Sequence, residues 1–216
     1  MTAYKLVVFD WDGTLIDSIE RIVACFRHTF QDANIPWPGE GAIKETIGLP
    51  LLDAFPSLIA GCDAAGATGL VDIYREYWLG PHVPQSTLFQ GVEDLLTWLG
   101  ETGYTLAIAT GKSRVGLDRD WLSNDIRHHF KLSRCAGEGR SKPDPDILHQ
   151  IMTEAGVAPE ETLLLGDHVL DLDMANAAGV DGIGVTTGSV SRERLMTSRP
   201  VACFDAVTEL RGFLGS

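Results

Sequence analysis

The feature of this sequence that most limits its fold is the regular alternation of short apolar runs with helical segments. Each run ends at small or polar residues, and apolar residues at helical spacing follow it. Runs of this kind lie at residues 5–9, 105–109, 132–135, 162–165, 180–185 and 201–204. The first, second and fourth are nearly all apolar, as expected for parallel strands covered on both faces. The alternation predicts an α/β fold built on a doubly wound parallel sheet.

Helices are expected between these strands. Residues 92–102 and 146–155 carry apolar residues at helical spacing, and Gly103 and Gly156 follow them directly. A glycine after such a segment is a common helix end, because it adopts a left-handed backbone conformation without strain. The sequence therefore predicts a helix at each of these two places.

The interval between the first two strands is too long for a simple crossover. About 95 residues separate Asp10 from Thr105, whereas a strand–helix–strand connection needs only a few dozen. Apolar residues at helical spacing near 19–30 and 70–78 predict helices within it, and Asp17 with Glu20 is expected to form a capping box. No part of the interval alternates like a strand. We therefore expect a helical insert, residues 16–86, over a core made of residues 1–15 and 87–216.

Charge and composition exclude several classes of function. The 216 residues carry a formal net charge of -13, so neither nucleic acid nor an anionic membrane is expected as a partner. No apolar run approaches the roughly 20 residues of a transmembrane helix, and no secretory signal is evident, so a cytoplasmic location is expected. The four cysteines are isolated in the sequence and are expected to be reduced and structural.

Two aspartates directly follow the first strand. Asp10 and Asp12 are two residues apart, so both side chains would lie on one face, and Gly13 then allows a sharp turn. Two like charges there are costly unless a cation lies between them or one carboxyl group is protonated. Asp-x-Asp-Gly also occurs in calcium loops, but the downstream EF-hand spacing is missing. The pair is therefore a candidate functional site, although Asp and Gly also simply end strands.

The second strand leads into Thr110-Gly111-Lys112-Ser113. Gly-Lys-Ser is found in phosphate-binding P-loops, but Leu106 stands where the upstream glycine of that motif is required. What remains is a hydroxyl group and backbone N–H groups at a strand end before a helix, which suit phosphate oxygens. A threonine that ends a strand is also common for structural reasons alone.

A lysine follows the third strand, next to two prolines. Lys142 precedes Pro143 and Pro145, which restrict the chain just before the expected helix at 146–155. The ammonium group would then be held firmly at the exit of the loop. Most single lysines are solvated, so Lys142 becomes a candidate only in combination with the other strand ends.

The fourth strand leads into a second pair of carboxylates. Asp167 and Asp171 are four residues apart, which suits two side chains on one side of a turn that enters a helix. Asp173 is expected to face solvent. His168 lies between the pair and is either a substrate contact or a residue that shapes the site.

Taken together, four strand ends bring Asp/Asp, Thr, Lys and Asp/Asp to one edge of a parallel sheet. In this respect the chain resembles the haloacid-dehalogenase-like hydrolase superfamily, over essentially its whole length. The four motifs are Asp10-Trp11-Asp12-Gly13-Thr14-Leu15, Thr110-Gly111-Lys112, Lys142-Pro143 and Gly166-Asp167-His168-Val169-Leu170-Asp171. The resemblance implies a Rossmann-like core with a helical cap domain.

Within the superfamily the chain is most similar to the phosphoglycolate-phosphatase-like subfamily. The segments that carry this likeness are Ile16-Asp17-Ser18 and Ile47-Gly48-Leu49-Pro50. One departure is His168, where the family usually has Thr or Ser, which puts a local hydrogen bond in doubt. The subfamily implies a small phosphorylated metabolite as substrate, with phosphoglycolate as the first candidate.

The resemblance also implies the roles of the catalytic residues. Asp10 would attack phosphorus and form an aspartyl-phosphate, and Asp12 would protonate the leaving group and then activate water. The remaining groups would hold phosphoryl oxygens or balance charge. They are Thr110, Lys142 and the backbone N–H groups of Trp11 and Gly111.

Magnesium is the cofactor that the resemblance implies. Its ligands would be the carboxylates of Asp10 and Asp167 and the backbone carbonyl of Asp12, with Asp171 reaching it through water or through neighbouring groups. Asp12 favours phosphoryl transfer over dehalogenation, since halide leaves without a proton.

Three alternatives remain open. A phosphosugar mutase and a pyrophosphatase share the fold, and a non-catalytic binding or regulatory module is the alternative of a different class. The residues of the insert that would choose among substrates, and the oligomeric state, do not follow from the sequence.

Overall fold

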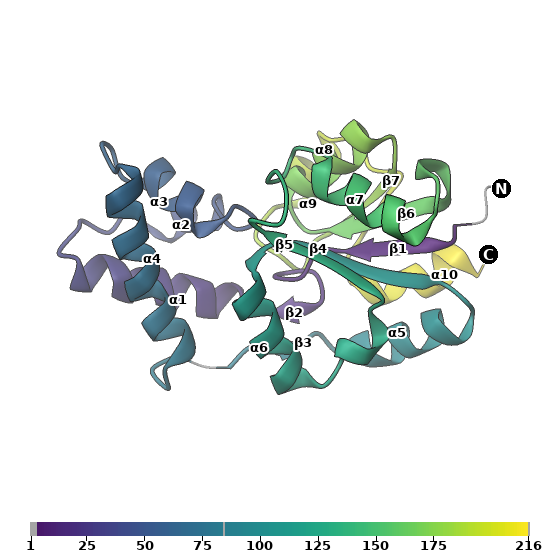
Figure 1. Cartoon of the computed structure of the whole chain (residues 1–216), viewed down its shortest axis with the longest axis horizontal. Helices are drawn as coiled ribbons and strands as arrows, with labels where there is room; N and C mark the ends of the chain where they lie inside the picture. Colours follow the sequence, from purple (N-terminus) through teal and green to yellow (C-terminus); the bar gives the residue numbers. More distant parts are fainter. Residues whose placement is uncertain (1–3, 84, 216) are drawn as a thin grey trace.

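A single six-stranded sheet forms the centre of the protein. The computed structural model describes residues 4–83 and 85–215, and its main sheet has the strand order β5-β4-β1-β6-β7-β8, with every neighbouring pair parallel (Figure 1). The strands are β1 (Leu6–Phe9), β4 (Thr105–Ser113), β5 (Leu132–Ala136), β6 (Thr162–Gly166), β7 (Asp181–Val185) and β8 (Ala202–Phe204). All six predicted strands are confirmed, and so is the α/β class.

Helices cover both faces of this sheet, as the nearly all-apolar strands predict. In β1, Val7 and Phe9 pack on one face against α5 (Val92–Glu101) and α6 (Arg114–Asn124). Leu6 and Val8 pack on the other face against the remaining pair of long core helices. These are α7 (Asp146–Ala155) and α8 (Val169–Ala178), which lie above the sheet in Figure 1. Two short helices complete the core, α9 (Arg192–Met196) and α10 (Leu210–Leu214).

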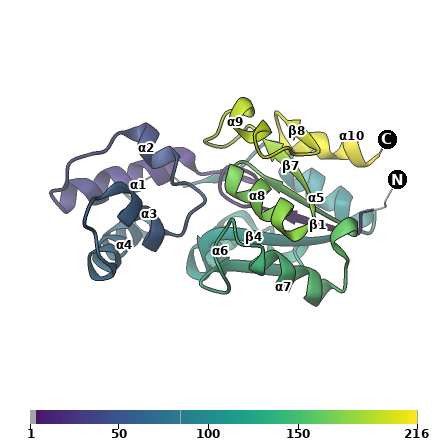
Figure 2. The same ribbon diagram turned by 90° about the horizontal axis from the view of Figure 1, so that it is seen from above.

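The insert is helical and has a hydrophobic core of its own. Its helices are α1 (Ile19–Asp32), α2 (Glu40–Lys44), α3 (Leu51–Leu58) and α4 (Ala64–Leu79). Phe26, Phe55 and Tyr74 are at the centre of this second core, with ring centroids 5.1 Å apart in the pairs Phe26–Phe55 and Phe26–Tyr74. The insert lies beyond the carboxyl ends of the strands (Figure 2).

A short antiparallel pair lies where the chain leaves and re-enters the core. Strand β2 (Ile16–Asp17) pairs with β3 (Thr87–Leu88), whereas the sequence predicts no strand in the interval. The two strands begin directly after the expected boundaries at 15/16 and 86/87. We propose that residues 1–15 with 87–216 form the core domain and residues 16–86 the cap domain.

The predicted start of the first insert helix is wrong. Asp17 lies in β2, and Ser18, not Asp17, is the N-cap of α1. The hydroxyl group of Ser18 donates to Asp12, 2.7 Å away, so it makes no capping bond to the helix. The interaction with the site therefore takes the place of a local cap.

Other element ends agree with the sequence to within a few residues. Helix α7 has its predicted bounds, and Gly156 ends it with a positive φ of 67°. Strand β4 extends four residues beyond its predicted end at Ala109, because Ser113 pairs with Ala136 of β5 after a shift in register. Among the described residues, no helix combines the length and the apolar character needed to cross a membrane.

The separate core of the insert makes a prediction about stability. Replacing Phe55, which is fully buried, with Ala should lower the free energy of unfolding by about 3–5 kcal/mol, because it removes a large side chain and leaves a cavity. Leu52 lies on the same helix but is 53% exposed. The substitution Leu52→Ala should change the free energy of unfolding by less than about 0.5 kcal/mol. Urea unfolding measures both values. Equal losses in the two variants would contradict this packing.

Candidate active site

The site lies at the carboxyl edge of the three central strands. Strand β1 lies between β4 and β6, so Asp10 after β1, Thr110 in β4 and Asp167 after β6 meet at one edge. All three side chains are buried. The backbone N–H of Asp10 donates to the carbonyl of Leu165, 2.9 Å away, and this bond continues the pairing of β1 with β6 to the site.

Lys142 joins two of the buried carboxylates. Its Nζ donates to Oδ1 of Asp10 at 2.7 Å and to Oδ1 of Asp171 at 2.5 Å, and these three side chains are at most 4% exposed. Burial alone would lower the pKa of Lys142, but the two carboxylates outweigh it and raise the pKa, so the ammonium group stays charged. The lysine before the two prolines therefore lies beside Asp10, and its role in catalysis stays a prediction.

A third carboxylate makes this cluster short of positive charge. Oxygen atoms of Asp10, Asp167 and Asp171 all lie within 4.8 Å of one another. Burial, followed by the charges of Asp10 and Asp171, raises the pKa of Asp167 well above its usual value. Burial likewise raises the pKa of Asp10 to about 6, against the opposing effect of Lys142. A divalent cation would relieve both costs.

The surroundings of Asp167 fit such a cation. Oδ1 of Asp167 accepts a hydrogen bond from Thr14 at 3.1 Å, whereas Oδ2 is buried and has no hydrogen-bond partner. A side chain at Gly13 or Gly188 would reach this oxygen, since an added Cβ would lie 2.6 or 1.7 Å from it. Glycine at both positions therefore lets the backbone approach Oδ2 where any side chain would collide with it. Oxygen ligands of this kind suit Mg²⁺.

Asp171 is occupied by other partners. Its Oδ1 accepts from Lys142, and its Oδ2 accepts from the backbone N–H of His168 at 3.1 Å. Both oxygens of Asp171 therefore already have hydrogen-bond partners, and an action of Asp171 on the metal through its neighbours stays a prediction. Asp173, two residues on, is exposed as expected.

His168 differs from the family pattern, which put a local hydrogen bond at this position in doubt. The structure shows a local hydrogen bond to the His168 side chain. His168 is the N-cap of α8, and its Nδ1 accepts from the backbone N–H of Leu170 at 3.2 Å. Burial and the charge of Lys142 lower the pKa of His168, which favours the neutral ring that this bond requires. The ring also lies beside Gly48 of the insert, where an added Cβ would be 3.8 Å from it.

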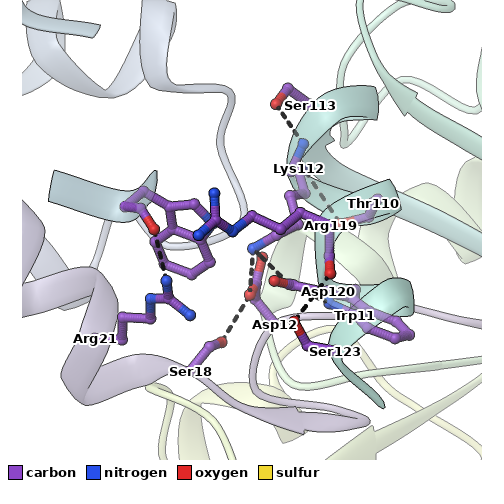
Figure 3. Close-up of polar contacts among 12 residues, drawn as sticks. Trp11, Asp12, Ser18, Arg21, Thr110, Lys112, Ser113, Arg119, Asp120 and Ser123 are labelled. Atoms are coloured by element: carbon purple, nitrogen blue, oxygen red, sulfur yellow. Dashed lines mark hydrogen bonds and ion pairs between the residues drawn. The ribbon is translucent and has the colours of Figure 1, made fainter. Parts of the chain in front are cut away.

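A second ion cluster surrounds Asp12 (Figure 3). The carboxylate of Asp12 accepts from Ser18 at 2.7 Å and from Nζ of Lys112 at 2.9 and 3.0 Å. The same Nζ lies 3.2 Å from Oδ2 of Asp120, which in turn accepts from the indole N–H of Trp11 at 2.9 Å. Burial would lower the pKa of Lys112, but Asp12 and Asp120 outweigh it and raise the pKa.

Sequence reasoning missed this cluster. Lys112 is predicted only as part of the Thr110-Gly111-Lys112-Ser113 segment, without a role of its own, and Asp120 is not among the predicted residues. In the sequence Asp120 is one of several acidic residues and gives no signal of burial, and its partner Trp11 is 109 positions away. Only the fold brings these groups together.

The insert touches the core at this same place. Nζ of Lys112 lies 4.0 Å from the centroid of the Trp78 ring of α4, a cation–π contact. Arg119 of α6 donates to the carbonyl of Leu79 at 2.9 Å. An added Cβ at Gly111 would lie 2.3 Å from the carbonyl oxygen of Gly48, so only glycine allows the insert to approach this closely.

A cavity of about 380 Å³ lies between the two parts. Asp10, Asp12, Thr110 and Gly111 line it on the core side, together with Lys112. The sequence therefore predicts four of the residues around the cavity, and the structure brings them together.

Three further predicted residues have side chains that do not line the cavity. Lys142 and Asp167 are buried beside Asp10 and do not line this cavity. The indole ring of Trp11 is buried against Trp121, and its backbone N–H hydrogen-bonds to the carboxylate of Asp10. Phosphate binding by the N–H groups of Trp11 and Gly111 stays a prediction.

The unpartnered oxygen of Asp167 leads to a prediction about metal binding. Mg²⁺ should raise the unfolding temperature of the protein, because a ligand at 100 times its Kd stabilises the folded state by about 2.7 kcal/mol. Asp167→Asn should remove this rise, and Asp173→Asn on the exposed side of α8 should retain it. Thermal unfolding with EDTA or Mg²⁺ measures the difference, and an undiminished rise in Asp167→Asn would argue against this metal site.

The cluster around Lys112 leads to a second prediction. Lys112→Met should lower the free energy of unfolding by about 3 kcal/mol, because it leaves two carboxylates near one another without their cation. Lys44, an exposed lysine paired with Glu40, provides the matched control, and Lys44→Met should cost less than about 0.5 kcal/mol. Chemical unfolding of both variants gives the comparison; similar small losses would show that the buried pairs contribute little.

Comparisons with known proteins agree with this geometry. The family model of the haloacid dehalogenase-like hydrolases matches residues 7–185. Among curated relatives, "Probable phosphatase IndB" of Dickeya dadantii is 33% identical over 96% of this chain and 92% of its own length. A 5'-nucleotidase of Pseudomonas aeruginosa is 30% identical over 99% of this chain and 96% of its own length. A phosphoglycolate phosphatase of Pseudomonas putida is 31% identical over 87% of this chain and 71% of its own length.

A solved structure has the same fold throughout. It is a haloacid dehalogenase-like family hydrolase from Streptococcus pneumoniae, with a TM-score of 0.86, 27% sequence identity and coverage of 99% of both chains. The parallel sheet, the four motif-bearing strand ends and the family match lead to one conclusion. The chain belongs to the haloacid dehalogenase-like hydrolase family.

Proposed function

We propose that this protein is a phosphatase that hydrolyses small phosphomonoesters with Mg²⁺, through an aspartyl-phosphate on Asp10. The observation that carries the proposal is the buried group of Asp10, Asp167 and Asp171 around Lys142, with Asp12 beside it at the cavity. The phosphatase names of relatives support it.

Asp10 has the features that a nucleophile needs here. It lines the cavity and is buried, and Lys142 donates to one of its oxygens. The negative charge of Asp10 would otherwise repel an incoming phosphate, and the lysine offsets charge on both groups. An oxygen of Asp10 attacks phosphorus as the bond from phosphorus to the alcohol oxygen breaks, which leaves a phosphoryl group on the carboxylate.

Asp12 is the group that we propose for proton transfer. It lines the cavity two residues from Asp10, and Ser18 and Lys112 hold its carboxylate in place. A carboxyl group there gives a proton to the departing alcohol oxygen. The resulting carboxylate then takes a proton from the water that attacks the aspartyl-phosphate and releases inorganic phosphate. An alcohol needs this proton and a halide does not, so Asp12 favours phosphatase over dehalogenase chemistry.

The metal ligands that we propose are the carboxylates of Asp10 and Asp167 and the backbone carbonyl of Asp12. Mg²⁺ bound there would offset negative charge on the phosphoryl oxygens. The buried Oδ2 of Asp167, which has no hydrogen-bond partner and is flanked by Gly13 and Gly188, supports this arrangement. Thr110, buried at the end of the cavity, is proposed to hold a phosphoryl oxygen.

The substrate that the resemblance names is phosphoglycolate, and the relative from Pseudomonas putida carries that name. The Pseudomonas aeruginosa relative is named as a 5'-nucleotidase instead, so related chains of similar identity differ in their substrates. The complete set of acidic, hydroxyl and lysine side chains supports an enzyme over a non-catalytic module.

The role of Asp10 can be tested by substitution. Asp10→Asn should lower kcat by at least about 10³-fold, because the amide is a poor nucleophile and single losses in a catalytic group are of this size. Asp94→Asn, at an exposed position of α5, should retain activity. Phosphate release with Mg²⁺ measures kcat, and thermal unfolding verifies the fold. Near-native turnover by Asp10→Asn would overturn the nucleophile assignment, and full activity in EDTA would overturn the requirement for metal.

A further inference from the structure

The cavity beside Asp10 has two chemically different ends. The core end carries carboxylates, a hydroxyl group and an ammonium group. The end formed by the insert is mostly apolar. Its main residues are Phe26, Ile47, Leu49, Val71, Tyr74 and Trp78. A phosphoryl group at Asp10 would therefore direct the rest of the substrate toward an apolar wall.

This apolar wall is held in place by its own packing. Phe26 and Tyr74 have ring centroids 5.1 Å apart, and Tyr74 stacks on Trp78 at 6.1 Å. All three side chains are at most 6% exposed and belong to the hydrophobic core of the insert. Because the rings are fixed by neighbours in the same core, the wall exists before a substrate enters. A wall of this kind favours apolar groups of matching shape.

The cations that line the cavity already face carboxylates. Lys112 contacts both Asp12 and Asp120. Arg75 lies on an outer part of α4 with 55% of its side chain exposed, and Asp72 is 3.5 Å from it. Among the lining residues that the structure describes, no other Lys or Arg is present.

At the insert end an anionic leaving group would meet a single described cation, Arg75, which already lies 3.5 Å from Asp72. Asp53 also lines the cavity and adds negative charge to the side that a leaving group would occupy. A carboxylate or second phosphate placed against the aromatic wall would lose its water without gaining a cation, which is costly. Glycolate is such an anion, and its body is too small to contact much of the wall.

We propose that the substrate is a phosphomonoester of an uncharged alcohol with an apolar, aromatic or branched body. The phosphoryl group lies at Asp10, and the body packs against Phe26 and Tyr74. The cavity volume of about 380 Å³ is within the range of roughly 300–1,000 Å³ found for sites that enclose drug-sized ligands. This assignment rests on the proposed phosphatase function and adds the chemical class of the leaving group.

The test compares two substrates that differ in charge at the leaving group. Phenyl phosphate and 3-carboxyphenyl phosphate have the same aryl–oxygen–phosphorus linkage, and only the second carries a carboxylate. We expect kcat/KM to be at least about tenfold higher for phenyl phosphate, mainly through a lower KM, which corresponds to about 1.4 kcal/mol. Phenyl phosphate should also exceed phosphoglycolate. Equal values, or a preference for either carboxylate-bearing substrate, would overturn the proposal.

A cation added at the cavity mouth should reduce this preference. Leu52 lines the cavity and is 53% exposed, so Leu52→Lys places an ammonium group there without burying it. The ratio of kcat/KM between the two aryl phosphates should fall by at least about threefold. Leu122→Lys is the matched control, because Leu122 is 87% exposed on α6 and does not line the cavity. An unchanged ratio in Leu52→Lys would contradict the proposed role of charge.

A binding measurement separates this proposal from the phosphatase function. Calorimetry with Asp10→Asn and Mg²⁺ should show at least about tenfold tighter binding of phenyl phosphate than of 3-carboxyphenyl phosphate. This variant lacks the proposed nucleophile and should bind both compounds without turnover, so the ratio of the two affinities reports on the leaving group alone. Failure of the native enzyme to hydrolyse any phosphomonoester would overturn the phosphatase function. Equal or reversed affinities in the variant would overturn the substrate class.

Discussion

Three carboxylates are buried around one ammonium group at the carboxyl edge of the sheet, and the rest of the site depends on how this negative charge is balanced. Lys142 pairs with Asp10 and Asp171, while Asp167 keeps one buried oxygen without a hydrogen-bond partner. Such an arrangement is costly for an isolated chain. A cation that entered together with a phosphoryl group would offset this cost, and this is the physical basis of the proposed chemistry. The parallel sheet makes it available because β1 lies between β4 and β6.

A second cluster connects this chemistry to the insert. Lys112 holds Asp12 and Asp120 and also lies over the ring of Trp78. The position of the proposed proton donor and the position of the aromatic wall are therefore linked through one side chain. The insert borders the cavity with residues of its own hydrophobic core. In the proposed function the core therefore supplies the phosphoryl chemistry and the insert selects the leaving group.

Much of the fold and the acidic site follow from local patterns in the sequence. Apolar runs identify all six strands, and the polar residues after them identify Asp10, Thr110, Lys142 and Asp167.

The wrong and missed predictions have non-local causes. The expected cap is missing because Asp17 lies in β2 and the hydroxyl group of Ser18 bonds to Asp12. Strand β4 is longer than predicted because Ser113 pairs with β5. Sequence reasoning missed Lys112 and Asp120 because both depend on partners about one hundred positions away. The aromatic wall consists of residues that any helical core would contain.

The most direct test of the account is to find the residue that carries the phosphoryl group during turnover. The variant Asp12→Asn should accumulate this intermediate with 4-nitrophenyl phosphate, because nitrophenolate leaves without a proton donor whereas hydrolysis of the aspartyl-phosphate needs the base. Rapid acid quench followed by peptide mass spectrometry locates the group. The account predicts a phosphorylated peptide with the modification on Asp10. Phosphorylation of another residue, or release of nitrophenolate with no phosphorylated peptide, would contradict it.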